Sequence, residues 1–338
     1  MMETLTDVLL VTANVGSLFD NLGEIQNDWL REFFTTVGTH KPRFVALHFQ
    51  EVGGKDYKAN MAHAENFFWT IESSSEMSEF DRACVYIDSD FKTEDNFTRK
   101  WSRKGYMRTR WMIHNQGLDL VNVHLFHDAS NLIACKSSPS VYSTYRQKAL
   151  RYVISRISDD FVPLPFFLFG DFNFRLDTLS LVQDLSTSAE VQMVMKDSTN
   201  EVEKIIYEDK GNDHKQVLFQ IETKRFLYLH HKLFREDTGR ELLEYDRETA
   251  AFQDIITEEE ILFLPSYPYS EDYTKPTQYM NTRCPSWCDR ILMSHNARDV
   301  IYRGNEGDRN ILYNILGPKV CMGDHKPVFL FFALKSNV

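Results

Sequence analysis

Residues 170–175 read GDFNFR, and they follow directly on the apolar run PLPFFLFG at 163–170. Asp171, Asn173 and Arg175 are spaced two apart, so their side chains project to the same side if the extended geometry of the apolar run persists. A carboxylate, an amide and a guanidinium on one side can meet water, a cation and an anionic group together. The spacing predicts a polar site just beyond the carboxyl end of a buried strand.

Polar residues end other apolar runs in the same way. Asn14 ends the first run, Gln50 and Glu51 the second, and Asn122 and His124 a later one, while WCDRIL (287–292) and GDHKPV (323–328) add acids and a histidine. Each residue alone has an ordinary structural explanation, such as a turn cap, a satisfied core histidine or a buried ion pair. Together they match what a metal-assisted phosphate hydrolase requires.

Hydrolysis of a phosphomonoester proceeds by in-line attack of water while negative charge spreads over the phosphoryl and leaving oxygens. Mg²⁺ held by one or two carboxylates offsets such charge. Glu51 is the best first ligand, with Asn14 beside it, and Asp324 reaches the metal directly or through water. Asp171 is then free to orient or deprotonate the attacking water, and Asn173 fixes that water or a phosphate oxygen.

Two histidines complete this hypothesis. His124 and His325 are expected to donate hydrogen bonds to the phosphoryl oxygens. A carboxylate behind an imidazole fixes its tautomer and raises its basicity, and Asp289 is the expected partner of His325.

The overall charge argues against some classes of partner. The 338 residues include 38 Lys and Arg against 49 Asp and Glu, a formal net charge of −11, which disfavours a protein that coats nucleic acid or anionic membrane. Residues 98–111, TRKWSRKGYMRTRW, contain no acid and are a local exception. A solvated loop and a binding loop for anions explain this stretch equally well.

The elements that must position these residues are a mixture of strands and helices. Strands are predicted at 7–14, 43–50, 83–87, 107–113, 118–125, 164–170, 287–293 and 327–334. Helical spacing of Ile25, Trp29, Phe33 and Val37, and of Leu150, Ile154 and Ile157, fills gaps between them.

Neighbouring strands without a helix between them, and a hairpin turn at 115–117, favour antiparallel pairing in a mixed sheet. The acid-rich middle, 198–260, is predicted to be polar and helical and to cover one edge. No linker divides the chain, so a single domain spanning 1–338 is expected.

The collinear pattern also carries a family resemblance. GDFNFRLD (170–177) and PSWCDRIL (285–292) resemble the two signature motifs of the inositol polyphosphate 5-phosphatases, within the endonuclease/exonuclease/phosphatase superfamily that has the fold of pancreatic deoxyribonuclease. TANVGSLFD (12–20), VNVHLFHDASN (121–131), YMNTRCPSWCDRILMS (279–294) and VCMGDHKPVF (320–329) resemble the type I enzymes.

This resemblance implies a four-layer α/β sandwich of two mixed, largely antiparallel sheets flanked by helices, and dependence on Mg²⁺. It implies removal of the 5-phosphate from soluble inositol 1,4,5-trisphosphate and inositol 1,3,4,5-tetrakisphosphate, which terminates calcium-mobilising signalling. It also carries catalytic roles onto Asn14, Glu51, His124, Asp171, Asn173, Asp289, Asp324 and His325.

Positive charge is expected to select the substrate. Arg103-Lys104-Gly105 is similar in placement to the Asn-Lys-Gly of other 5-phosphatases, which favours Lys104 as a phosphate ligand. Arg175 suits bidentate phosphate contact. By resemblance Arg283, and more weakly Tyr279, grip the 4-phosphate. Two further substrate contacts are expected, Asn122 and Lys326, although Lys326 is equally well explained as a surface charge.

The chain departs from its relatives at some positions. KPTQYM (275–280) stands where lipid-hydrolysing relatives carry a Tyr-Lys-Tyr-like stretch, and 88–101 is shorter than the insertion of type I relatives. Type I relatives end in a prenylated Cys, whereas this chain ends ALKSNV, so membrane contact is expected only if the native chain continues to such a signal.

The five cysteines are odd in number and scattered, which favours a reducing compartment, and a cytoplasmic monomer is expected. Its expected partner is a small inositol polyphosphate and no nucleic acid. The alternatives are a nuclease, which needs an extended basic groove, a phosphoinositide-lipid phosphatase, and a catalytically dead binding protein.

Overall fold

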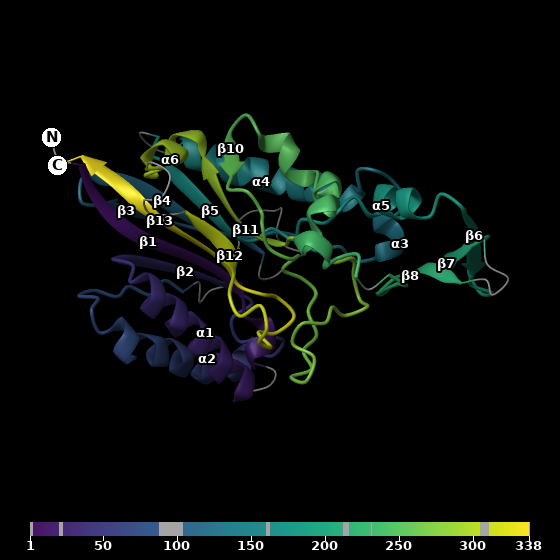
Figure 1. Ribbon diagram of the computed structural model, residues 1–338, viewed down its shortest axis with the longest axis horizontal. Coiled ribbons are helices and arrows are strands. Elements are labelled where there is room, and N and C mark those ends of the chain that lie inside the picture. The colour runs from purple at the N-terminus through teal and green to yellow at the C-terminus, as the bar shows by residue number, and fades with distance from the viewer. Residues whose placement is uncertain are drawn as a thin grey trace.

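The computed structural model describes residues 3–19, 23–87, 104–159, 163–211, 216–230, 232–304 and 311–337. Within these residues the chain forms two mixed sheets packed face to face, helices on both outer sides, and a third sheet that projects from the body (Figure 1). The predicted four-layer α/β sandwich is confirmed, and the third sheet is additional to it.

The first sheet runs in the order β12 (Leu312–Ile315), β13 (Val328–Asn337), β1 (Glu3–Asn14) and β2 (Phe44–Gln50). The second runs β10 (Ile256–Glu258), β11 (Asp289–Ser294), β5 (Phe166–Asp171), β4 (Gln116–His124) and β3 (Gly105–Ile113). One pair in each sheet is parallel, β1 with β2 and β4 with β5, and the other pairs are antiparallel. The two parallel pairs bring the carboxyl ends of four strands to one edge of the sandwich.

The third sheet is antiparallel throughout and runs β6 (Ala189–Met195), β7 (Val202–Asp209), β8 (Val217–Glu222) and β9 (Arg225–Tyr228). The α-helices are α1 (Glu24–His40), α2 (Tyr57–Glu72), α3 (Asn131–Ala134), α4 (Val141–Asp159), α5 (Thr178–Leu185) and α6 (His295–Val300). Short 3-10 turns occupy η1 (Gly16–Phe19), η2 (Ser75–Met77), η3 (Glu236–Tyr245) and η4 (Glu248–Phe252).

Alternation of side chains along the strands creates the layers. In β1, Leu9 and Val11 pack against α1 and α2, whereas Val8 and Leu10 face the space between the two sheets. In β5 the outward residues Phe166 and Leu168 pack against α4. Strands with apolar residues on both faces are those that lie between two layers. This accounts for the continuous apolar runs in the sequence.

The two predicted helices are confirmed. Ile25, Trp29, Phe33 and Val37 are all buried on the face of α1 that contacts the first sheet. Leu150, Ile154 and Ile157 are buried in the same way on α4. The hairpin between β3 and β4 turns at positions 114–115, because Ile113 pairs with Gln116, one residue earlier than predicted.

Two predictions of secondary structure are wrong. Residues 83–87 form no strand in the structure, and Val85, Tyr86 and Ile87 are each more than half exposed, since no neighbouring strand pairs with them among the described residues. The middle of the chain is not mainly helical, because β7, β8 and β9 lie within 198–260. The buried residues of β8 and β9, Phe219 with Ile221 and Phe226 with Tyr228, recur at the period of a strand and not of a helix.

No helix of the described residues is long and apolar enough to cross a membrane.

Candidate active site

The predicted site residues meet at one edge of the sandwich. Asn14, His124 and Asp171 are the last residues of β1, β4 and β5, and Glu51 follows the last residue of β2. Within the second sheet, Asp171 lies opposite His124 on one side and opposite Asp289 on the other. The register of the strands therefore sets the spacing of the polar groups.

Asp171 is the centre of a buried hydrogen-bond network. Its Oδ2 accepts from Nδ2 of Asn14 at 3.0 Å and from Nδ2 of Asn173 at 3.0 Å, and its Oδ1 accepts from the backbone N–H of Asn173 at 2.9 Å. Nε2 of His124 is 3.3 Å from Oδ2. Burial by itself opposes ionisation, but His124, His325 and Lys104 outweigh it and hold the pKa of Asp171 well below its ordinary value. This carboxyl group is therefore ionised.

The trio Asp171, Asn173 and Arg175 is assembled differently from the prediction. β5 ends at Asp171, and Asn173 has a left-handed backbone with φ of 52°, so the extended geometry does not persist. The side chains still meet, because Nη2 of Arg175 donates to Oδ1 of Asn173 at 2.7 Å and Asn173 donates to Asp171. A non-glycine residue in this conformation is strained, and such strain is found at functional sites.

The predicted pair of Asp289 and His325 is confirmed as a contact. Oδ2 of Asp289 lies 2.8 Å from Nδ1 of His325 and accepts from the hydroxyl of Ser266 at 2.7 Å. Although burial favours a neutral imidazole, Asp289, Asp324 and Asp171 outweigh it and raise the pKa of His325 to about 10. His325 is therefore a cation at neutral pH, with Nε2 left to donate away from Asp289.

Glu51 lies beside the two basic groups of the site. Its Oε1 is 3.6 Å from both Nζ of Lys104 and Nε2 of His124, and Lys104 also contacts His124. A Cβ added at Gly16 would lie 2.9 Å from Oε2 of Glu51 and 3.4 Å from Oδ1 of Asn14. The absence of a side chain at Gly16 thus leaves room for two oxygen ligands to converge.

Asp324 lies next to these oxygen ligands. Ser17, adjacent to Gly16 in η1, donates to Oδ1 of Asp324 at 2.8 Å and contacts Oε1 of Glu271 at 2.6 Å. The oxygen donors of Glu51, Asn14 and Asp324 are the hard ligands that Mg²⁺ prefers, so the residues present fit this metal.

A second acidic cluster lies next to them. Ligand atoms of Asp171, Asp289 and His325 lie within 4.8 Å of one another. Oδ1 of Asp289 is buried and has no hydrogen-bond partner among the described residues. A buried carboxylate oxygen without a donor is suited to a cation or to a proton-bearing ligand.

Basic groups line the other side of the site. Arg175 stacks over the ring of Tyr267, with 4.5 Å from its guanidinium carbon to the ring centre, and its Nε and Nη1 are buried without a hydrogen-bond partner among the described residues. Burial, together with the nearby charges of Lys104, Arg175 and Arg283, lowers the pKa of His127 to about 4. These groups form a cationic rim of the kind that phosphates require.

Three of the predicted substrate contacts have other partners. Lys326 is fully buried, and its Nζ donates to the carbonyl oxygens of Gly317, at 3.0 Å, and Val320, so neither an outer substrate contact nor a surface charge describes it. The hydroxyl of Tyr279 donates to the carbonyl of Pro265 at 2.9 Å. Asn122 accepts from Gln50 at 2.8 Å and donates to the carbonyl of Phe49 at 3.0 Å, which links the two sheets.

The described basic residues of the stretch 98–111 also differ in their partners. Arg108 and Arg110 both bind the buried carboxylate of Asp119 across the β3–β4 hairpin, and Lys104 alone of the described basic residues in this stretch reaches the site. Arg99, Lys100 and Arg103 lie outside the described residues. Arg283 is partly buried and donates to the carbonyls of Thr223, Thr282 and Asp128.

Sequence reasoning missed several neighbours. Ser17, Ser266 and Tyr267 contact site residues, and His127 lies on the cationic rim. Only His127 had a usable signal, because it follows His124 by three residues in VNVHLFHD. The others come from loops whose position depends on the packed sheets.

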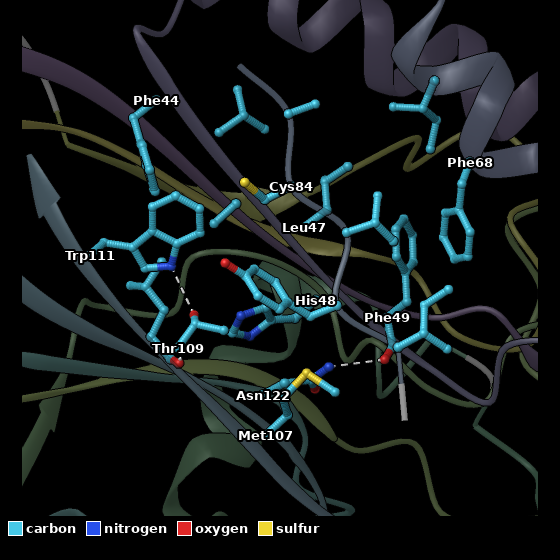
Figure 2. Close-up of a pocket in the computed structure, with 18 of the residues that line it drawn as sticks. Phe44, Leu47, His48, Phe49, Phe68, Cys84, Met107, Thr109, Trp111 and Asn122 are labelled. Atoms are coloured by element: carbon cyan, nitrogen blue, oxygen red, sulfur yellow. Dashed lines mark hydrogen bonds between the residues drawn. The ribbon is translucent and has the colours of Figure 1, made fainter. Parts of the chain in front are cut away.

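A pocket of about 2180 Å³ opens beside the site, between β2 and the β3–β4 hairpin. Figure 2 shows part of its lining, with Phe44 and Trp111 at the left, Phe49 and Phe68 at the right, and the hydrogen bond from Asn122 to the carbonyl of Phe49 in the lower part of the view. At one end it reaches Glu51 and His124. The pocket is bordered by residues next to the stretch 88–103, which lies outside the described part of the chain.

Comparison with known proteins agrees with this arrangement. Residues 26–331 match the model of the Endonuclease/Exonuclease/phosphatase family 2. The human protein named inositol polyphosphate-5-phosphatase A is 46% identical over 386 residues, covering 97% of this chain and 93% of the human one. A Caenorhabditis elegans protein named probable type I inositol 1,4,5-trisphosphate 5-phosphatase is 30% identical over 413 residues, covering 96% and 98%.

The fold is also found in a solved structure. The inositol polyphosphate 5-phosphatase domain of SPsynaptojanin, in complex with inositol (1,4)-bisphosphate and calcium ion, superimposes with a TM-score of 0.55 over 99% of this chain and 85% of that one, at 13% identity. This likeness concerns the fold. The family model and the relatives establish that the chain belongs to the type I inositol polyphosphate 5-phosphatases of the endonuclease/exonuclease/phosphatase superfamily.

Proposed function

We propose that this 5-phosphatase, as a single catalytic domain spanning 1–338, acts on soluble inositol 1,4,5-trisphosphate and inositol 1,3,4,5-tetrakisphosphate with Mg²⁺ as its cofactor. The observation that carries the proposal is one edge where Asp171 and His325 lie together and two basic groups reach them. Lys104 contacts His124 beside Asp171, and Arg175 is hydrogen-bonded to Asn173. The name of the C. elegans relative, which specifies the trisphosphate, supports the substrate.

In the proposed reaction, water attacks the 5-phosphate in line with the leaving inositol oxygen. Asp171 orients this water. Because its pKa lies well below the ordinary value, it is a weak base and suits orientation better than deprotonation. Asn173, which is hydrogen-bonded to both Asp171 and Arg175, positions the same water or a phosphoryl oxygen.

His325 is the proposed donor to the phosphoryl oxygens, since Asp289 holds it as an imidazolium with Nε2 free to donate. Burial and the neighbouring Lys104 lower the pKa of His124, although Asp171 and Glu51 act against this, so His124 is a neutral imidazole. A neutral His124 is proposed to position Asp171 and a phosphoryl oxygen rather than to supply charge.

Glu51 would hold the cation, with Asn14 beside it and Asp324 directly or through water. Bound Mg²⁺ offsets the negative charge that develops on the phosphoryl and leaving oxygens. Gly16 leaves the room for these oxygen ligands.

The remaining phosphates are proposed to contact the cationic rim. Arg175 supports this role most strongly, because two of its N–H groups are buried without a partner among the described residues. Lys104 and Arg283 contribute further charge. The proposed role of Asn122 changes from substrate contact to support, because both ends of its amide bind protein groups.

The proposed setting is the cytoplasm, where removal of the 5-phosphate terminates calcium-mobilising signalling. A longer, prenylated form of the protein would associate with the plasma membrane.

The test is release of phosphate from inositol 1,4,5-trisphosphate in Mg²⁺ and in EDTA, with the product isomer identified by chromatography. We expect the 1,4-bisphosphate in Mg²⁺ and no release in EDTA. Asp171→Asn is expected to abolish turnover while substrate binding and the melting temperature change little. Release of phosphate only from phosphoinositides in vesicles would replace the soluble substrate by a lipid, and turnover that persists in EDTA would reject the metal.

A further inference from the structure

Strand β6 is an edge of the third sheet and exposes apolar side chains. Val191, Met193 and Met195 alternate along it, so they share one face, and they are 48%, 63% and 41% exposed. In the part of the chain that the structure describes, β6 pairs only with β7. Figure 1 shows β6 and β7 at the end of the sheet that projects from the body. An exposed, apolar edge strand is a template for pairing with another strand.

The exposed face continues a core face. Met193 lies opposite Ile205 in β7, and Ile205 lies opposite Ile221 in β8. Ile221 is fully buried in the main core, whereas Met193 at the end of the same row is 63% exposed. The row is therefore covered by the main core at Ile221 and left exposed to solvent at Met193.

The backbone of β6 is oriented for pairing. The N–H of Asp209 donates to the carbonyl of Gln216 at 2.9 Å, on the β8 side, so the neighbouring Glu208 faces β6 and its partner Glu190 faces β7. The register of β6 with β7 shifts once, between Val194 and Met195. Because backbone groups of a strand point alternately to its two sides, Val191, Met193 and Met195 direct their N–H and C=O groups to the open edge. These three residues are in position to extend the antiparallel ladder.

We propose that two copies of this chain associate through antiparallel pairing of their β6 strands, centred on Met193. This register places Met193 opposite Met193, and Val191 opposite Met195 of the second copy. It also places Glu190 opposite Lys196 of the second copy, twice by the two-fold symmetry. Opposite charges that face each other across strands stabilise the pair, so the charge pattern selects this register.

A second copy fits this edge better than an anionic membrane. The sheet carries Glu190, Glu201, Glu203 and Glu208 on or beside its first two strands, and the chain has a formal net charge of −11. Anionic lipid would repel these groups. A strand that presents both a glutamate and a lysine at matching distances from its centre complements itself. The association differs from the monomer expected from the sequence.

The test is sedimentation velocity of the full chain between about 1 and 100 µM, a range that covers weak association. We expect a concentration-dependent dimer. Lys196→Glu should raise the dissociation constant at least about tenfold, because two attractive pairs become two repulsive ones. The double variant Glu190→Lys with Lys196→Glu should restore wild-type association, since it exchanges the charges and keeps the register.

Two controls separate this edge from general effects. Lys58→Glu, an exposed position on α2, makes the same change in net charge and should leave the dimer intact. Met193→Lys should dissociate it, whereas Met112→Lys, 68% exposed on the edge strand β3, should not. At a concentration low enough for the wild type to be monomeric, all variants should keep the wild-type melting temperature, because the altered side chains are exposed.

A chain that remains monomeric over the whole range would overturn the proposal. A dimer that persists in Met193→Lys would also overturn it. If Met112→Lys dissociated the dimer and Met193→Lys did not, the interface would lie on β3 and the proposal would be wrong. A double charge exchange that fails to restore association would reject the register centred on Met193.

Discussion

At the scale of single residues, charge and hydrogen bonding define the chemistry of the site. Asp171 accepts three hydrogen bonds from two asparagines, and Asp289 holds His325 as a cation. Two carboxylates of the same type therefore serve different purposes, because their neighbours differ. Asp171 accepts hydrogen bonds from the two asparagines, whereas Asp289 raises the pKa of His325 and keeps it charged.

The role of Asp289 can be tested by removing its charge. In Asp289→Asn the pKa of His325 should fall, because the main group that raises it is lost. We expect kcat to fall by about 10–100-fold, and the alkaline limb of the pH–rate profile to move to lower pH, since less imidazolium remains. Asp254→Asn on the surface is the control. An unchanged alkaline limb would show that protonated His325 is not the donor to the phosphoryl oxygens.

His48 provides a test of pH-dependent stability away from the proposed ligands. It stacks on Phe169 with 3.5 Å between ring centres, and its Nδ1–H donates to the carbonyl of Phe169 at 3.1 Å. Burial lowers its pKa to about 3. The unfolded chain binds a proton at this histidine below about pH 6.5, where the folded chain does not. Its contribution to stability is therefore complete above pH 6.5 and is lost as the pH falls toward 3.

The measurement is urea unfolding of the wild type and His48→Gln at pH 7.5 and 5.5. The wild type should lose up to about 1.4 kcal/mol more than the variant over this interval, which corresponds to one group titrating over one pH unit. His63→Gln, exposed on α2, should follow the wild type. If His48→Gln showed the same pH dependence as the wild type, this histidine would not be the titrating group.

At the scale of elements, close contact of neighbouring strands holds the site. Gly170 lies in β5 between Val123 of β4 and Arg290 of β11. A Cβ at this position would lie 1.8 Å from the carbonyl oxygen of Val123. Glycine before Asp171, the proposed water-orienting residue, is thus required by the parallel strand β4, in addition to any effect on the chemistry.

Gly170→Ala should therefore separate β4 from β5 and reduce the free energy of unfolding by at least about 3 kcal/mol. Gly38→Ala is the matched control, because a Cβ there would meet no heavy atom within 4 Å inside α1. It should stabilise the protein by about 0.5–1 kcal/mol through helix propensity. Equal effects in chemical denaturation would contradict the close-contact explanation.

At the scale of the whole molecule, a buried ionic network joins distant segments around the site. Arg146 of α4 is fully buried and binds Glu248 of η4 at 2.9 and 2.6 Å and Asp128 at 2.5 Å. Glu248 in turn accepts from the backbone N–H of Arg175 at 2.9 Å. The guanidinium of Arg146 therefore links the loop of Arg175, through Glu248, to the loop of Asp128, whose carbonyl accepts from Arg283.

Arg146→Met should reduce the free energy of unfolding by about 3–5 kcal/mol, because it leaves two carboxylates buried without their partner. Arg303→Met is the control, since its pair with Glu259 is partly exposed and should contribute less than about 1 kcal/mol. The measurement is the midpoint and slope of urea unfolding. Similar losses in the two variants would show that the network does not hold these loops.

The sequence by itself determined most of the sandwich and most of the candidate site. Apolar runs and helical spacing are local properties, so the sequence alone locates β1, β2, β4, β5, α1 and α4. The acid, amide and imidazole residues at strand ends were also visible, because parallel strands present their carboxyl ends at one edge.

Only the tertiary structure decided which basic and polar groups remain available. Lys326, Arg108 and Arg110 bind carbonyls or Asp119, and Asn122 links the two sheets, whereas Lys104 and Arg175 reach the site. The sequence also did not predict the third sheet, and it predicted a strand at 83–87 that does not form. A side chain's partners and a strand's neighbour come from distant parts of the chain, and no local pattern records them.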